Sequence, residues 1–208
     1  EHDAKNNIHA RIDRKRKFPV TTLLKCLISS VSENYLQECT KNNVEPDQKK
    51  IQGMTGEEIL NIFYENNEFK KDKYGWSSNL DLSFYKGKLM TFDILDPKNG
   101  KIIINKGIKI TQRIINEVEK KKLKLFSISN ESLLGGFIAS DLINDKTGKI
   151  YYEAGFEIDE DFLLFIEENK ITKFSLLKAD NISIGTHIRN TLQLDKARSR
   201  EEALFEIF

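Results

Sequence analysis

The chain has 208 residues, enough for one large domain or two small ones, and we expect two cores. Hydrophobic residues make up 39% and charged residues 31%, and no segment approaches the roughly 20 apolar residues of a membrane helix, which argues against a membrane role. The net charge of +1 argues against a surface that binds nucleic acid over its whole area, so any such contact should be local.

The first residues and the cysteines bear on the setting of the protein. The sequence begins Glu1-His2-Asp3, without an initiator Met and without the charged and apolar regions of a signal peptide. We therefore expect it to start within a longer protein or after processing. Cys26 and Cys39 are too few for a disulfide framework or a cysteine-rich zinc site. These features predict a cytoplasmic protein.

The densest charge cluster occupies residues 11–17, with five basic residues and one acidic residue. The basic ones are Arg11, Arg14, Lys15, Arg16 and Lys17. Such a run can bind phosphates, gaining affinity from released counterions. It can also form a solvated edge strand whose charges prevent unwanted pairing. The residues alone favour neither interpretation.

Two helices are predicted in the first third of the chain. One covers residues 18–27, where Pro19 stands at the start of an apolar stretch, and the other covers residues 56–64. The polar segment 29–50 between them is expected to be a loop with one helical turn near Tyr35. Further on, the only tryptophan of the chain lies among charged residues, and a core position is favoured for it over a partner surface.

An internal repeat with a constant spacing of 48 residues dominates the second half of the chain. The matched pairs are Asp93 and Asp141, Lys98 and Lys146, Gly100 and Gly148, and Gly107 and Gly155. In each copy a short apolar segment, an Asp/Asn-Lys-Gly turn and a β-branched or aromatic run predict a β-hairpin. A helix should follow, with Thr111 or Asp159 as its N-cap, and then a closing strand over residues 123–128 or 171–176.

The two copies, about residues 88–128 and 136–176, are each too small to bury much apolar area alone. We therefore expect them to pack on each other about a pseudo-two-fold axis, in one α+β domain of about residues 81–179.

No constellation of residues typical of an enzyme is present. His2, His9 and His187 lack a metal-binding spacing, and no phosphate-binding glycine loop occurs. Asp93 and Asp141 could be paired carboxylates, but hydrogen bonds to the backbone of their own turns are favoured. The loop at residues 96–100 lacks the ligands of a calcium loop, and Gly135-Gly136 is interpreted as a bulge or a close backbone approach. We predict no catalytic residue and no metal site.

Several segments, including residues 57–64, carry a resemblance to a known family. Residues 11–25, Arg-Ile-Asp-Arg-Lys-Arg-Lys-Phe-Pro-Val-Thr-Thr-Leu-Leu-Lys, closely resemble the lobe motif of bacterial RNA polymerase β subunits. Residues 187–195 and 200–208 resemble the segment where the chain of that family re-enters the lobe. The repeat is similar to an insertion that the lobe carries in many members. Residues 29–53 have no counterpart in the usual pattern, and the first part of the lobe is missing, so the resemblance implies a fragment.

The resemblance implies an α+β fold, in which partial helical lobe segments flank a duplicated β-hairpin–helix–strand insertion domain. Residues 1–66 would be the first lobe segment, with the atypical insert 29–53. Residues 67–183 would be the insertion domain, and residues 184–208 the return segment. The isolated fragment is expected to self-associate through its lobe helices, because the missing part would leave apolar surface uncovered.

The function implied is that of a non-catalytic part of the enzyme that transcribes DNA into RNA from ribonucleoside triphosphates. The fragment would form a cleft wall and a surface for transcription regulators, with β′, α, ω and σ subunits and DNA as partners. It would hold no cofactor, because magnesium is bound elsewhere in the parent enzyme. The residues expected to contact DNA are Arg11, Arg14, Lys15, Arg16 and Lys17. The alternative is an independent protein-binding adaptor domain with no enzymatic role.

Overall fold

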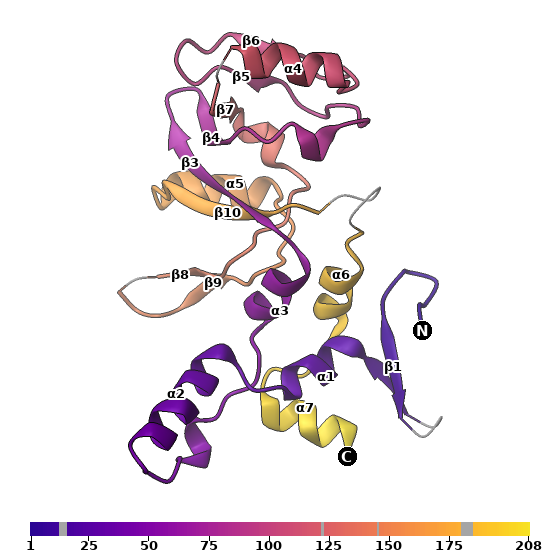
Figure 1. The fold of residues 1–208 in the computed structure, drawn as a ribbon, viewed down its shortest axis with the longest axis vertical. Helices are drawn as coiled ribbons and strands as arrows, with labels where there is room; N and C mark the ends of the chain where they lie inside the picture. The colour runs from indigo at the N-terminus through magenta and orange to yellow at the C-terminus, as the bar shows by residue number, and fades with distance from the viewer. Residues whose placement is uncertain (13–15, 122, 145, 180–184) are drawn as a thin grey trace. The chain divides into compact units, whose positions relative to one another are not determined.

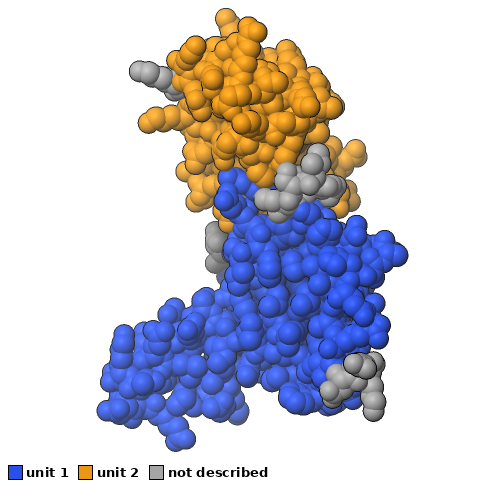
Figure 2. Space-filling view, turned by 45° about the vertical axis from the view of Figure 1, so that its right-hand side comes forward, with its two compact units in different colours: residues 1–65, 141–155, 178–208 blue, residues 66–140, 156–177 orange. Residues whose placement is uncertain are grey.

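The computed structural model describes residues 1–12, 16–121, 123–144, 146–179 and 185–208. The chain combines helices with antiparallel strands, so the expected α+β class is confirmed. The chain forms two compact units, coloured separately in Figure 2. Unit 1 comprises residues 1–65, 141–155 and 178–208, and unit 2 comprises residues 66–140 and 156–177. In the described part of the chain, no helix is long and apolar enough to cross a membrane.

Unit 1 is mainly helical (Figure 1). Its elements are β1 (His9–Ile12), β2 (Arg16–Pro19), α1 (Val20–Cys26), α2 (Ser30–Lys41), η1 (Gln48–Lys50), α3 (Gly56–Phe63), β8 (Leu142–Ile143), β9 (Ile150–Tyr152), α6 (His187–Leu194) and α7 (Arg200–Ile207). Helices α1 and α7 pack side by side, although they come from opposite ends of the sequence. Helices α1 and α3 confirm the two helices predicted for residues 18–27 and 56–64.

Helix α2 corrects the loop predicted for residues 29–50. Ser29 caps this 12-residue helix by accepting a hydrogen bond from the backbone N–H of Ser32. The helix buries only Ser32 and Cys39, so its sequence lacks the apolar stripe by which helices are recognised. The segment 29–52, called the excursion below, begins and ends at the same place, because Ile28 forms a bridge with Gly53. A closed base of this kind explains how the segment fits between α1 and α3.

Glu58 joins the beginnings of α2 and α3. One carboxylate oxygen accepts from the backbone N–H of Thr55 at 2.9 Å and completes a capping box, in which the Thr55 hydroxyl accepts from Glu58 N–H. The other oxygen accepts from the backbone N–H of Ser30 at 2.9 Å, and from its hydroxyl. Partial burial raises the pKa of Glu58, but these hydrogen bonds outweigh it and leave the pKa below its ordinary value of 4.5.

The lowered pKa makes the cap sensitive to acid. The ionised form is favoured in the folded chain, so its contribution is present above pH 4.5 and is lost as the pH falls through the lowered folded value. Glu58→Ala should cost about 1 kcal/mol of unfolding free energy at neutral pH. Glu58→Gln keeps an acceptor and should cost less, while removing this component of the acid dependence. Urea unfolding at neutral pH and near pH 4 tests both, and an acid dependence of Glu58→Gln equal to that of the parent chain would contradict the assignment.

Unit 2 is built on a six-stranded antiparallel sheet with strand order β10-β3-β4-β7-β5-β6. Its elements are β3 (Asn66–Asp72), β4 (Gly75–Asn79), η2 (Ser83–Tyr85), β5 (Ile94–Leu95), β6 (Ile102–Ile104), α4 (Gln112–Lys120), β7 (Leu125–Ile128), η3 (Asn130–Leu133), α5 (Glu160–Glu168) and β10 (Lys173–Leu177). The hairpins, helices and closing strands predicted for the repeat are all present. The hairpin β3–β4, which the sequence analysis did not predict, lies between the closing strands β10 and β7 of the two copies.

Both copies contribute strands to this sheet, but their closing strands do not pair with each other. The interposed hairpin pairs β3 with β10 and β4 with β7, so the closing strands never meet. It also supplies Trp76, which is fully buried and meets the ring of Phe174 edge-on at 4.5 Å. The Trp76 indole N–H donates to the Asn130 side chain at 3.0 Å. The core position favoured for Trp76 is therefore confirmed.

The copies have matching backbones but place their hairpins differently. Hairpin β5–β6 extends the sheet of unit 2 because Leu95 pairs with Ser127 of β7. In the second copy the edge of β10 is taken by Ile138, which forms a bridge with Leu176. Hairpin β8–β9 forms its own two-stranded sheet and belongs to unit 1. The second copy thus contributes residues to both units, which the repeat pattern did not reveal.

Candidate functional site

Three residues of the basic segment 11–17 lie on the paired antiparallel strands β1 and β2, namely Arg11, Arg16 and Lys17. Arg11 lies opposite Lys17, and Ile12 lies opposite Arg16. Because opposite residues share a face and neighbours alternate, Arg11 and Lys17 stand together on the face away from the buried Phe18. Arg11, Arg16 and Lys17 are all exposed. Arg14 and Lys15, the other two residues expected to contact DNA, lie outside the described residues.

Among the described residues of this hairpin, the positive charges are only partly balanced by ion pairs. The Arg11 guanidinium pairs with the Glu1 carboxylate at 3.0 Å, and its hydrogen bond holds the pKa of Glu1 below the usual value. Both side chains are about half exposed, and exposed pairs of this kind contribute little to stability. Two like charges directly opposite each other repel, and the Glu1 carboxylate offsets part of the repulsion between Arg11 and Lys17, since both residues lower its pKa.

The hairpin is attached to a buried polar cluster centred on Asp195, which follows α6. Its carboxylate accepts from the hydroxyls of Thr21 and Thr22 at 2.7 and 3.2 Å, and from the backbone N–H of Ala197 at 3.0 Å. The Lys25 ammonium pairs with it at 3.1 Å. The Asp195 side chain is fully buried and that of Lys25 is 12% exposed. Helix α1, which follows β2 directly, is thereby bound to the distant return segment.

One further hydrogen bond ties the start of the hairpin to α6, and another joins the two ends of the hairpin to each other. The backbone N–H of Ile8 donates to the Thr191 hydroxyl at 2.8 Å, and the N–H of Val20 donates to the carbonyl of Ile8 at 3.0 Å. The Thr191 hydroxyl in turn donates to the His187 carbonyl one turn earlier in α6. Unit 1 therefore presents its basic hairpin from a scaffold that unites residues from both ends of the chain.

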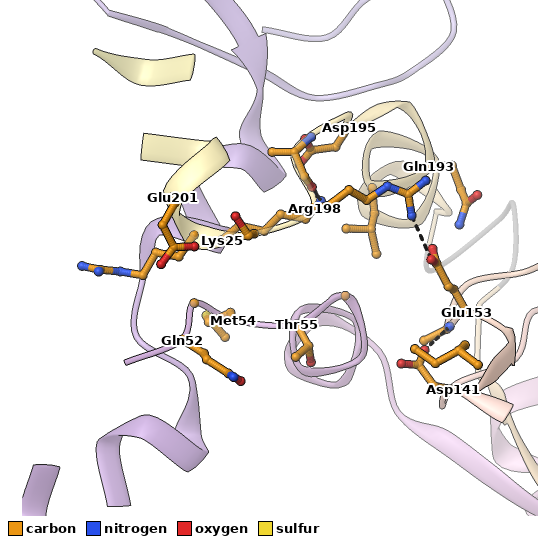
Figure 3. A pocket seen from close by; sticks show the side chains of 18 of the residues that line it. Lys25, Gln52, Met54, Thr55, Asp141, Glu153, Gln193, Asp195, Arg198 and Glu201 are labelled. Atoms are coloured by element: carbon orange, nitrogen blue, oxygen red, sulfur yellow. Dashed lines mark hydrogen bonds and ion pairs between the residues drawn. The ribbon is translucent and has the colours of Figure 1, made fainter. Parts of the chain in front are cut away.

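A cavity of about 540 Å³ lies within unit 1, beside this cluster (Figure 3). Its walls come from the segment 49–56, the hairpin β8–β9 and the link between α6 and α7. Arg198 reaches across to Glu153, with a nitrogen–oxygen distance of 2.8 Å. Four basic and four acidic side chains line the cavity, so it favours neither an anion nor a cation. Among the described residues no group of three His, Cys, Asp or Glu side chains could hold a metal ion.

The two repeated aspartates have structural roles. Asp93 accepts from the backbone N–H of Lys106 at 2.6 Å, and Asp141 accepts from that of Ala154 at 2.6 Å. Each bond spans the base of its hairpin, and the turn itself is held by other side chains, such as Asp96 in the first copy. The backbone role favoured for these aspartates is thus confirmed, at the base of the hairpin instead of the turn.

Sequence reasoning missed the residues that join the two ends of the chain. Asp195 lies 174 positions after Thr21, and no local pattern marks these two residues or Lys25 as partners. The one available signal is an aspartate directly after an amphipathic helix, and this signal does not identify the partners of the aspartate. Only the fold brings these side chains together.

The structure defines an α+β chain whose two ends share one buried polar cluster. No family model matches the chain. Over all 208 residues it is 40% identical to the DNA-directed RNA polymerase subunit beta of Rhizobium meliloti (strain 1021), and 38% identical to that of Sinorhizobium fredii (strain NBRC 101917 / NGR234). The chain spans 13% of the length of each relative. The chain belongs to the β subunit family of DNA-directed RNA polymerase, as its motifs indicated.

Proposed function

We propose that the chain is a non-catalytic part of a polymerase that transcribes DNA into RNA from ribonucleoside triphosphates. Similarity to two β subunits over the whole chain supports this, because both relatives are named for that enzyme. The partners would be the β′, α, ω and σ subunits and DNA. Magnesium and the nucleotide substrates would be held by other segments of the assembled enzyme.

The observation that carries a DNA-contacting role is the pairing of Arg11 with Lys17 on an exposed hairpin face. Two cations held side by side can neutralise successive phosphates, and the release of counterions makes such a contact favourable. The Asp195 cluster supports this role, because it restrains the helix that follows the hairpin and so limits the loss of entropy on binding. Unit 1 would then form part of the wall of a DNA cleft, and unit 2 would offer a surface to regulators.

The test uses polymerase assembled with a full-length β subunit. Arg11→Gln with Lys17→Gln should shorten the lifetime of promoter complexes. The same variant should lower the slope of log affinity against log salt by about 0.9 for each phosphate that is no longer neutralised. Arg14→Ala with Arg16→Ala should act in the same direction.

A matched control removes two exposed lysines from the excursion that contains α2, Lys41→Gln with Lys50→Gln. This control should leave the salt slope unchanged, although it alters the net charge by the same amount. If the hairpin variants keep the parent slope while the assembled enzyme is intact, the hairpin does not contact DNA.

A further inference from the structure

The two copies of the repeat carry opposite charge. Residues 81–128 hold 11 Lys and Arg against 5 Asp and Glu, a net charge of +6. Residues 129–176 hold 4 against 10, a net charge of −6. The chain as a whole is nearly neutral, so this division is hidden in the overall composition. The two copies therefore differ in charge as well as in the placement of their hairpins.

The backbone hydrogen bonds near these charged residues are the same in both copies. Gly87 N–H donates to the Ile110 carbonyl at 2.8 Å, and Gly135 N–H donates to the Ile158 carbonyl at 2.9 Å. The bridge between Leu89 and Lys109 has its equivalent between Phe137 and Glu157. The second copy therefore serves as an internal control, with the same ladder and different side chains.

We define the basic patch as the four residues on and beside this ladder in the first copy, Lys86, Lys106, Lys109 and Arg113. All four side chains are exposed. In the second copy the equivalent positions hold Leu134, Ala154, Glu157 and Asp161. Two of the four cations are thus replaced by carboxylates and the other two by apolar residues.

The cations of the basic patch are available to an external partner. Among the described residues, no carboxylate lies within ion-pair distance of Lys86, Lys106 or Lys109, and Arg113 pairs with Glu117 at 2.9 Å. Arg113 also lies in the first turn of α4, where the helix dipole disfavours a positive charge. The equivalent Asp161 stands in the first turn of α5, where the dipole favours it. Arg113 thus carries a local cost that an anionic partner would offset.

We propose that the basic patch binds the phosphate backbone of a nucleic acid, without reading its sequence. The first copy uses ten lysines and one arginine, and lysine acts on phosphates as a flexible point charge. Lysine is depleted in protein interfaces, where arginine and aromatic residues dominate, so an acidic protein fits this surface less well. The acidic second copy is repelled by the same polyanion, so the pair would orient the repeat with its basic copy toward the nucleic acid. This contact is separate from the one proposed for Arg11 and Lys17.

The test measures binding of the 208-residue chain to a fluorescent DNA duplex of mixed sequence by anisotropy, at several salt concentrations. Lys86→Gln, Lys106→Gln and Lys109→Gln are combined in one variant. The control combines Lys146→Gln, Lys149→Gln and Lys170→Gln, which are exposed lysines of the second copy. Both variants change the net charge by the same amount. The patch variant should bind at least about tenfold more weakly at low salt, with a salt slope reduced by up to about 2.7, and the control should match the parent chain.

Equal losses in the two triple variants would show a general charge effect and overturn the proposal, as would unchanged binding of the patch variant. If the patch variant loses binding to polyglutamate of the same charge as the duplex, but binds DNA like the parent chain, the patch binds an acidic protein instead. Lysine acetylation of the parent chain, with and without duplex, tests the same idea without substitution. Lys106 and Lys109 should be protected and Lys146 and Lys149 should not. The variant Arg11→Gln with Lys17→Gln is measured in the same assay. It tests the DNA contact proposed for the hairpin independently of the DNA contact proposed for the basic patch.

Discussion

Asp195→Ala is expected to lower the free energy of unfolding by about 3–5 kcal/mol, the loss typical when one partner of a buried ion pair is removed. The substitution leaves the Lys25 ammonium, 12% exposed, without its carboxylate. It also leaves the hydroxyls of Thr21 and Thr22 and the N–H of Ala197 without their acceptor. Chemical unfolding followed by far-ultraviolet circular dichroism measures the loss.

Two further variants identify the cause of that loss. Asp195→Asn keeps an acceptor but strands the lysine charge, so adding Lys25→Met should recover part of the stability that Asp195→Asn alone loses. Glu153→Ala breaks an ion pair with Arg198 at the same cavity, where the two side chains are 63% and 72% exposed, and should cost less than about 1 kcal/mol. A loss for Asp195→Ala no larger than for Glu153→Ala would mean that the cluster does not hold unit 1 together.

Trp76→Ala is expected to destabilise unit 2 by about 3–5 kcal/mol, because it empties the space of a fully buried indole. The cavity would open beside Phe174, whose ring also packs against Phe69 and Phe162. The indole N–H bond to Asn130 would be lost as well.

Trp76→Phe separates packing from hydrogen bonding. It keeps an aromatic ring against Phe174 and should cost clearly less than Trp76→Ala, while Asn130→Ala removes only the hydrogen-bond partner. Trp76 is the only tryptophan, so fluorescence of the parent chain reports on unit 2. The Trp76 variants lack this signal, and circular dichroism therefore follows the unfolding of all the variants. Equal stability of the parent chain and Trp76→Ala would contradict the core role of Trp76.

The parts of the fold that were predicted correctly are those whose signals are local. The repeat could be read from turn glycines and caps, and the structure has Asp159 accepting from Phe162 N–H at 2.8 Å as the spacing indicated. Helix α2 was missed because it is exposed almost all round, and hydrophobic periodicity is the signal that burial imposes. The hairpin β3–β4 was missed because β3 is rich in charged residues and buries only Phe69. Neither failure could have been corrected without knowing the neighbours.

The sequence by itself determined the family, the α+β class, the repeat and the positions of its caps and turns, because each depends on residues close together in the chain. Only the tertiary structure decided that Asp195 meets Thr21, that β3–β4 separates the two copies, and that hairpin β8–β9 belongs to unit 1. These features depend on pairs of residues far apart in sequence. The free energy that selects such pairs comes from burial and from satisfying buried polar groups, which no single segment encodes.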